Sequence, residues 1–221
     1  KSFMFSQSEE NYLKAIFHLT SAEKSGITTN EIAEKLATKP SSVTDMIQKL
    51  SDKKVVIYKK YYGVELTDSG RKIAANIVRK HRLWEVFLVE KLHFPWDEVH
   101  DIAEQLEHIQ SLKLIRQLDQ FLGFPTQDPH GDPIPDINGN LKSIEKCLLS
   151  TLEKNESGIC VGVDDSSSEF LKFLDKKGIT LGKQIIVLDK EDFDDSLLIE
   201  IENQKIPISK KIANNLYIQK S

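Results

Sequence analysis

The chain has 221 residues, of which 39% are hydrophobic and 29% are charged, a composition typical of a globular protein with room for two or three small domains. No apolar run approaches the roughly 18 residues of a membrane span, and KSFMF at the start is too short for a signal peptide, so we expect a cytoplasmic protein without a membrane partner. The two cysteines, Cys147 and Cys160, form no CxxC pair, which argues against a disulfide scaffold and a thiolate zinc site. The net charge of -4 hides a charge of +3 over residues 1–73 and -5 over residues 74–140, which suits nucleic acid at one end and a cation in the middle.

The first 73 residues predict a winged helix-turn-helix. Apolar side chains recur at helical spacing in three segments, over residues 8–20, 29–36 and 41–50. We expect Ser41 and Ser42 to cap the third helix, after a break at Pro40. Two β-rich runs, residues 55–58 and 64–67, flank the tip KKYYG and predict a hairpin that forms the wing.

The third helix is the candidate recognition helix. A helix that enters the major groove needs groups on its solvent side that reach phosphates and base edges, and Gln48 is the residue best suited to read a base. Ser and Thr near a helix N-terminus suit phosphates, and a basic, aromatic wing tip suits an adjacent backbone. The alternative is a solvated helix face in a protein that never meets DNA. The predicted DNA contacts are Lys39, Ser41, Ser42, Thr44, Gln48, Lys49, Lys59, Lys60 and Tyr61.

The middle of the chain predicts three helices, and the last third predicts a small β domain. The helices run from LTDSG to about residue 92, from about 96 to 107 and from about 112 to 122. A Pro-rich turn region, FPTQDPHGDPIPDINGN, follows them. Five short apolar runs beyond Gly158, namely ICVGV, KQIIVL, SLLIEIE, KIPIS and LYIQ, suggest a small β-barrel. The expected protein is therefore mostly α with a small β domain, divided at residues 1–73, 74–140 and 141–221.

The stretch VHDIAEQLEH concentrates groups that can bind a metal. On a helix, its imidazoles and carboxylates fall within one quadrant, opposite Ile102, Ala103 and Leu106. The same spacing also fits the solvated face of any amphipathic helix. The groups in question are His100, Glu104, Glu107 and His108.

The preceding helix favours the metal. His81 and Glu85, four residues apart, fall inside the apolar stripe that includes Trp84 and Leu88. A carboxylate beside such a stripe is costly unless it is paired or coordinated, so the two residues form either a buried ion pair or part of a metal site. Imidazole nitrogen and carboxylate oxygen without thiolate suit Mn²⁺ or Fe²⁺ and do not exclude Zn²⁺ or Co²⁺.

Six stretches in one order, SEENYLKAI, PSSVTDMIQKL, LTDSGRKIA, RKHRLWEVFL, VHDIAEQLEH and PHGDPIP, carry a family likeness. With them, essentially the whole chain resembles the diphtheria-toxin-repressor family of metal-dependent transcriptional regulators. The resemblance implies an N-terminal winged helix-turn-helix, a helical dimerisation and metal-binding domain, and a C-terminal SH3-like, FeoA-like barrel. It also implies a homodimer that binds double-stranded operator DNA when it holds a divalent metal ion.

The resemblance also assigns ligands. A main site would use Asn11, His81, Glu104, Glu107 and His108, and a possible ancillary site would use Glu85, His100, Asp128, His130 and Glu169. The chain departs from the family pattern at Asn11, where Asp or Met is common, and at Lys14, where manganese sensors can have an acidic ligand. Lys14 argues against a two-metal cluster. Glu104 and Asp128 stand where Cys is frequent in the family and therefore favour a hard ion.

The sequence thus predicts a homodimeric repressor that binds operator DNA with Mn²⁺ and controls metal-uptake genes. One alternative is an Fe²⁺-responsive repressor of the same family. Another is a winged-helix regulator whose His/Glu face is only structural. A metal-dependent hydrolase is the third, but the chain offers no Asp-rich two-metal signature and no nucleophile, so we do not expect an enzyme.

Overall fold

The computed structural model describes residues 5–20, 26–59, 61–142 and 144–220. The chain forms two compact units. One comprises Lys1–Trp84, Ala103–Leu118 and Ile134–Leu141, and the other comprises Glu85–Ile102, Asp119–Pro133 and Lys142–Ser221. Each unit is described below by itself.

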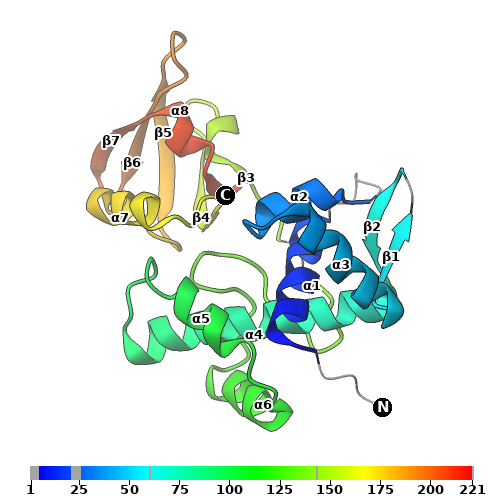
Figure 1. Ribbon diagram of the computed structural model, residues 1–221. Helices are drawn as coiled ribbons and strands as arrows, with labels where there is room; N and C mark the ends of the chain where they lie inside the picture. Colours follow the sequence, from blue (N-terminus) through cyan, green and yellow to red (C-terminus); the bar gives the residue numbers. More distant parts are fainter. Residues whose placement is uncertain (1–4, 21–25, 60, 143, 221) are drawn as a thin grey trace. The chain divides into compact units, whose positions relative to one another are not determined.

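The first unit begins with a winged helix-turn-helix, coloured blue to cyan in Figure 1. Its elements are α1 (Gln7–Leu19), α2 (Thr29–Lys35), α3 (Pro40–Asp52), β1 (Val56–Lys59) and β2 (Gly63–Leu66). A capping box starts α1, because the Ser6 hydroxyl accepts from the Glu9 backbone N–H and the Glu9 carboxylate accepts from the Ser6 N–H. The strands pair antiparallel, with Val56 opposite Leu66. The predicted helix-turn-helix and wing are confirmed.

The prediction that Ser41 and Ser42 cap α3 is wrong. The helix begins at Pro40, its cap residue is Lys39, and no side chain caps it. Proline has a fixed φ that suits the first helical turn, and it lacks the N–H that would go unpaired there. The helix therefore starts before the two serines, which lie exposed in its first turn.

The core of the winged helix draws on every one of its helices. Leu13 and Ile16 of α1, Ile32 of α2, Leu50 of α3 and Val64 of β2 are fully buried in one cluster. Burying such a side chain contributes about 1.5–3 kcal/mol. Packing therefore holds α1 firmly against the helix-turn-helix.

Three further helices follow the wing. They are α4 (Asp68–Leu92), α5 (His100–Leu106) and α6 (Leu112–Phe121), and α4 and α6 match the prediction. The predicted helix over residues 96–107 is too long at both ends, because residues 96–99 are turn and bend, and Glu107 and His108 form a turn after α5 has ended. The expectation that these two residues share a helix face with His100 is therefore wrong. Within the described part of the chain, no helix combines the length and apolarity that crossing a membrane requires.

The second unit contains the β domain, coloured yellow to red in Figure 1. Its strands are β3 (Cys147–Leu148), β4 (Ser157–Val163), β5 (Gln184–Lys190), β6 (Leu197–Ile201), β7 (Gln204–Ile208) and β8 (Leu216–Lys220). They form one antiparallel sheet in the order β3-β8-β4-β5-β6-β7. The five predicted strands are confirmed, and β3 is an addition.

Two helices of the β domain are absent from the sequence-based prediction, α7 (Ser168–Lys177) and α8 (Lys210–Ala213), together with the short 3₁₀ turn η1 (Leu149–Thr151). The signal for α7 is present in the sequence, since Leu171 and Leu174 recur at helical spacing and both are fully buried. Gly178 ends the helix in the left-handed conformation, with φ of 67°.

Candidate metal centres and nucleic-acid interface

Glu107 is the centre of the first candidate metal site. Its side chain is fully buried, and its oxygen Oε2 lies 2.6 Å from Lys14 Nζ and 2.6 Å from His81 Nδ1. Lys14 belongs to α1 and His81 to α4, while Glu107 lies in the turn after α5. Three segments far apart in the sequence therefore meet at one carboxylate. His81 itself is 6% exposed, as its place in the apolar stripe predicts.

The surroundings keep Glu107 ionised. Burial would raise the pKa of Glu107, but the hydrogen bond with His81 and the charge of Lys14 outweigh it and hold the pKa below its ordinary value. Lys14 Nζ also lies 3.2 Å from His81 Nδ1. Glu107 is thus a buried anion whose Oε2 atom is paired with Lys14 and His81.

Two residues of the predicted main site have unpaired acceptor atoms. Among the described residues, Asn11 Oδ1 and Glu107 Oε1 are buried and have no hydrogen-bond partner. A buried polar atom left unpaired costs about 1–3 kcal/mol, and more for a charged group, so such atoms call for a ligand. Amide and carboxylate oxygens are donors that hard divalent cations accept, and both atoms belong to residues of the predicted main site.

His108 is oriented by a carboxylate, an arrangement common for metal-binding imidazoles. Its Nδ1 lies 2.6 Å from Glu10 Oε2, and Gln110 Nε2 donates to Glu10 Oε1 at 2.6 Å. With Nδ1 engaged, the other nitrogen, Nε2, lies 3.9 Å from Glu107 Oε1. His108 is therefore placed to offer Nε2 beside the unpaired oxygen of Glu107.

Sequence reasoning missed Glu10 and Gln110 as members of this site. Glu10 is only 4% exposed although it lies in the first turn of α1. The signal was weak, because an acidic residue near a helix N-terminus is ordinarily explained by the helix dipole. Glu104 of the predicted set is half-buried on α5.

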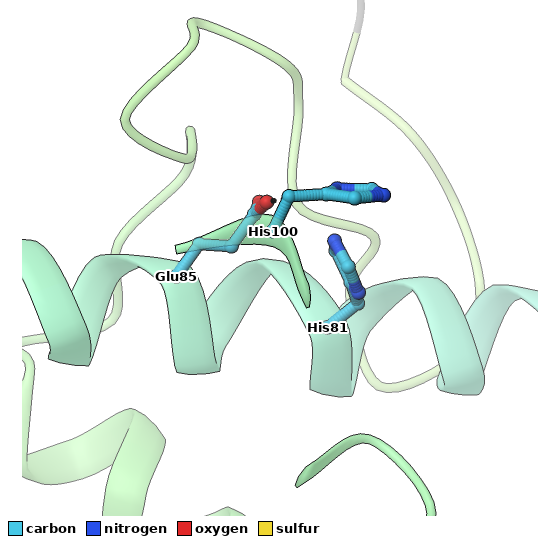
Figure 2. Close-up of side chains that lie close together, drawn as sticks. All are labelled: His81, Glu85 and His100. Atoms are coloured by element: carbon cyan, nitrogen blue, oxygen red, sulfur yellow. Dashed lines mark ion pairs between the residues drawn. The ribbon is translucent and has the colours of Figure 1, made fainter. Parts of the chain in front are cut away.

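A second cluster lies wholly within the other unit. One ligand atom each of Glu85, Asp128 and His130 lies within 4.8 Å of the others, and all three residues are buried. His100 Nδ1 is 3.5 Å from Glu85 Oε1, although the His100 side chain is 56% exposed. Figure 2 shows Glu85 and His100, together with His81 from the preceding turn of the Glu85 helix. Two imidazoles and two carboxylates suit a divalent ion.

The ring of His130 has a defined orientation. Its Nε2 lies 2.8 Å from the carbonyl oxygen of Trp96, and a carbonyl can only accept, so Nε2 carries the proton. The other ring nitrogen, Nδ1, lies 3.9 Å from Glu85 Oε1. Neither this cluster nor the first includes Glu169, which is exposed in the first turn of α7.

The predicted DNA contacts lie on the surface. On α3 and just before it, the exposed residues are Lys39, Ser41, Ser42, Thr44, Gln48 and Lys49. Their apolar neighbours Val43, Ile47 and Leu50 are buried. In the wing, Lys59 is exposed and pairs with Glu65 at 2.8 Å, and Tyr61 is 91% exposed. Lys60 lies outside the described residues.

Comparisons with known proteins agree with this arrangement. Three family models match in succession: the iron dependent repressor N-terminal DNA binding domain over residues 4–64, the iron dependent repressor metal binding and dimerisation domain over residues 67–136, and the FeoA domain over residues 147–220. The HTH-type transcriptional regulator MntR of Bacillus subtilis is 34% identical over 143 residues, which cover 65% of this chain and 95% of that protein. A solved structure described as a manganese-dependent transcriptional repressor complex with manganese has a TM-score of 0.84 at 32% identity, and the match covers 96% of this chain and all of that one.

These findings define a winged-helix protein with a metal-binding and dimerisation domain. The chain belongs to the diphtheria-toxin-repressor family of metal-dependent transcriptional repressors, in the form with a C-terminal FeoA domain. The iron-dependent repressor IdeR of Mycobacterium tuberculosis is 35% identical over 130 residues, which cover 58% of this chain. The match spans only about half of that relative, 55% of its length.

Proposed function

We propose that this protein is a Mn²⁺-dependent repressor that binds operator DNA as a homodimer and controls metal-uptake genes. The observation that carries the proposal is the pair of buried, unpaired oxygens, Asn11 Oδ1 and Glu107 Oε1. In the proposed main site, the ion is held by Asn11, His81, Glu104, Glu107 and His108, and without metal His81 also contacts Glu107. In the proposed second site, Glu85, His100, Asp128 and His130 hold another.

The donor set supports Mn²⁺ over softer ions. Both clusters offer oxygen and imidazole nitrogen, and the two cysteines, Cys147 and Cys160, lie in the FeoA domain. Among relatives, one is named an iron-dependent repressor, and one solved structure is described as a manganese-dependent repressor in complex with manganese. Fe²⁺ is therefore the alternative ion.

The main site offers a route from metal to DNA. Asn11 belongs to α1, which packs against α2 and α3, whereas Glu107 and His108 belong to the turn after α5. A bound ion supplies a positive charge that joins these groups. If the ion binds more tightly when α1 is in one arrangement, it shifts the population toward that arrangement. The shift cannot exceed the difference between the ion's affinities for the two arrangements.

The proposed domain division is residues 1–73 for DNA binding, 74–140 for dimerisation and metal binding, and 141–221 for the C-terminal domain. For the homodimer we propose a surface on α6, where Leu114 is 38% exposed and Phe121 is 64% exposed, two side chains that share one face of the helix. Exposed apolar side chains that form one patch are typical of an interface. Leu114→Lys is therefore expected to shift the protein toward monomers in sedimentation analysis.

The metal preference is tested by titration. We expect Mn²⁺ to promote binding to a DNA duplex at lower free concentration than Fe²⁺ under anaerobic conditions. The duplex would be selected from a random pool with both ions present, and binding would be followed by fluorescence anisotropy. Equal activation by the two ions would remove the preference for Mn²⁺, and equal DNA binding without metal would contradict metal dependence altogether.

The DNA interface predicts different outcomes for two exposed neighbours on α3. Lys49→Ala is expected to weaken binding to all duplexes alike and to reduce the slope of log K against log salt by about 1, because one phosphate contact is lost. Gln48→Ala is expected to cost about 1–3 kcal/mol on the selected duplex only, because a base contact is lost. Lys205→Ala, an exposed lysine on β7, is the matched control. Wild-type salt dependence in Lys49→Ala would exclude this helix as the phosphate-binding element.

A further inference from the structure

The segment Trp96-Asp97, which precedes α5, is tied to helix α7 of the β domain by three side chains. Ser168 Oγ donates to Asp97 Oδ2 at 2.9 Å, and Lys172 Nζ lies 3.2 Å from the same oxygen. Trp96 Nε1 donates to Asp175 Oδ2 at 3.1 Å. The Asp97 side chain is only 3% exposed. All of these residues belong to the second unit.

The same segment holds the ring of His130. The Trp96 carbonyl accepts from His130 Nε2 at 2.8 Å, and the two rings stack with centroids 6.1 Å apart and an interplanar angle of 14°. The backbone of His130 is fixed as well, because its carbonyl oxygen accepts from the Val163 N–H of β4 at 3.0 Å. The direction in which His130 Nδ1 points is therefore set by residues that themselves depend on α7.

Asp97 is a charged anchor in this arrangement. Burial would raise the pKa of Asp97, but hydrogen bonds from Ser168 and Lys172 outweigh it and hold the pKa below its ordinary value. A nearly buried carboxylate with charged and hydroxyl donors is expensive to separate from them. Moving residues 96–97 away from α7 would therefore break an ion pair and two side-chain hydrogen bonds.

We propose that Trp96 and Asp97 form a clamp through which α7 orients His130, so that the β domain sets the metal affinity of the Glu85–Asp128–His130 cluster. The inference rests on the proposed function, because it assumes that this cluster binds metal. Trp96 and Asp97 are positioning residues: they touch the ligand His130 or its support rather than the ion. Partners that orient a metal-binding histidine typically change affinity about 10- to 100-fold when they are removed.

The test uses the full chain with Glu107→Gln, which disables the main site, and titrates it with Mn²⁺ alone. Calorimetry gives affinity and stoichiometry. Tryptophan fluorescence gives a local signal, because Trp96 stacks on His130 and the chain has only one other tryptophan, Trp84. In Trp96→Phe the fluorescence signal should be lost, and calorimetry should show weakened Mn²⁺ binding because the hydrogen bond to Asp175 is lost.

Three variants and one control then separate positioning from general stability. Asp97→Ala is expected to weaken Mn²⁺ binding about 10- to 100-fold. Asp97→Asn still accepts from Ser168 but loses the ion pair with Lys172, so it should weaken binding less than Asp97→Ala does. Ser168→Ala, a milder change on α7, should weaken binding to an intermediate extent even if Asp97→Ala does not fold. Asp189→Ala removes an exposed ion pair with Lys154 in the same domain and should change nothing.

The outcomes distinguish the clamp from the site. If Mn²⁺ binds this background but Asp97→Ala and Ser168→Ala match the Asp189→Ala control, the clamp is refuted and the metal site stands. If no Mn²⁺ binds the Glu107→Gln background at all, the second metal site is refuted, and the clamp with it.

Discussion

Glu107→Gln is expected to abolish Mn²⁺ binding at the main site and Mn²⁺-dependent DNA binding, while leaving a folded protein. The change removes the carboxylate that presents an unpaired oxygen 3.9 Å from His108 Nε2, so the loss of main-site affinity should exceed the roughly 100-fold seen when an outer partner is removed. Metal-free stability should fall by about 3 kcal/mol, the lower end for a broken buried pair, because the remaining Lys14 is 12% exposed and can turn to water. Thermal unfolding with and without Mn²⁺, together with calorimetry, measures both effects.

The control for Glu107→Gln is Glu90→Gln, an exposed glutamate on α4. It should match the wild type in metal affinity and in unfolding temperature. If Glu107→Gln binds the selected DNA as the wild type does and still responds to Mn²⁺ at this site, the His/Glu cluster is only structural and the proposed main site is wrong.

Acid should remove the difference in stability between wild type and Glu107→Gln. The pKa of Glu107 is lowered in the folded protein from its usual 4.5, so its contribution is fully present above pH 4.5 and is lost as the pH falls through the lower folded value. The metal-free proteins should therefore differ most at neutral pH and converge below pH 4.5. Denaturant unfolding over this range checks the sign, and a gap that widens on acidification would contradict an ionised Glu107.

The helices and strands that carry the sites could be predicted from the sequence because their periodicity is strong. In α4, the apolar stripe placed His81 and Glu85 inside, and both are buried. The end of α5 could not be predicted in this way, because the hydrophobic pattern continues past Leu106 whereas the helix ends there. Whether Glu107 extends the helix or turns inward is decided by Lys14 and His81, which are 93 and 26 residues away along the chain.

The partners within the sites were beyond sequence reasoning for a similar reason. The likeness to a family selects ligand positions such as Asn11 and His108, but it says nothing of Glu10 and Gln110, which hold His108 through contacts about 100 residues apart. The sequence shows that Lys14 stands where manganese sensors of the family can have an acidic ligand. Only the fold reveals that its ammonium lies against a buried carboxylate.

In the proposed main site, Lys14 is the cation that neutralises Glu107 in the absence of metal. This role predicts that Lys14→Met and Glu107→Gln lower the stability by different amounts. Removing Glu107 leaves a lysine that can reach water, whereas removing Lys14 leaves a fully buried carboxylate that keeps its contact with His81 but loses its lysine cation. Without metal, Lys14→Met should therefore be less stable than Glu107→Gln, and the loss relative to wild type should approach the upper part of the range of about 3–5 kcal/mol for a broken buried pair.

Mn²⁺ should reverse this order. An ion bound at Glu107 replaces the missing positive charge, so the rise in unfolding temperature on adding Mn²⁺ should be larger in Lys14→Met than in wild type and absent at this site in Glu107→Gln. Lys72→Met, an exposed lysine on α4, is the matched control and should respond as the wild type does. The double variant closes a thermodynamic cycle in which Lys14 and Glu107 should couple strongly without metal and weakly with it. If Mn²⁺ leaves the coupling energy between Lys14 and Glu107 unchanged, the ion and the Lys14 ammonium do not act on the same carboxylate. One cation can replace the other only where both pair with the same anion.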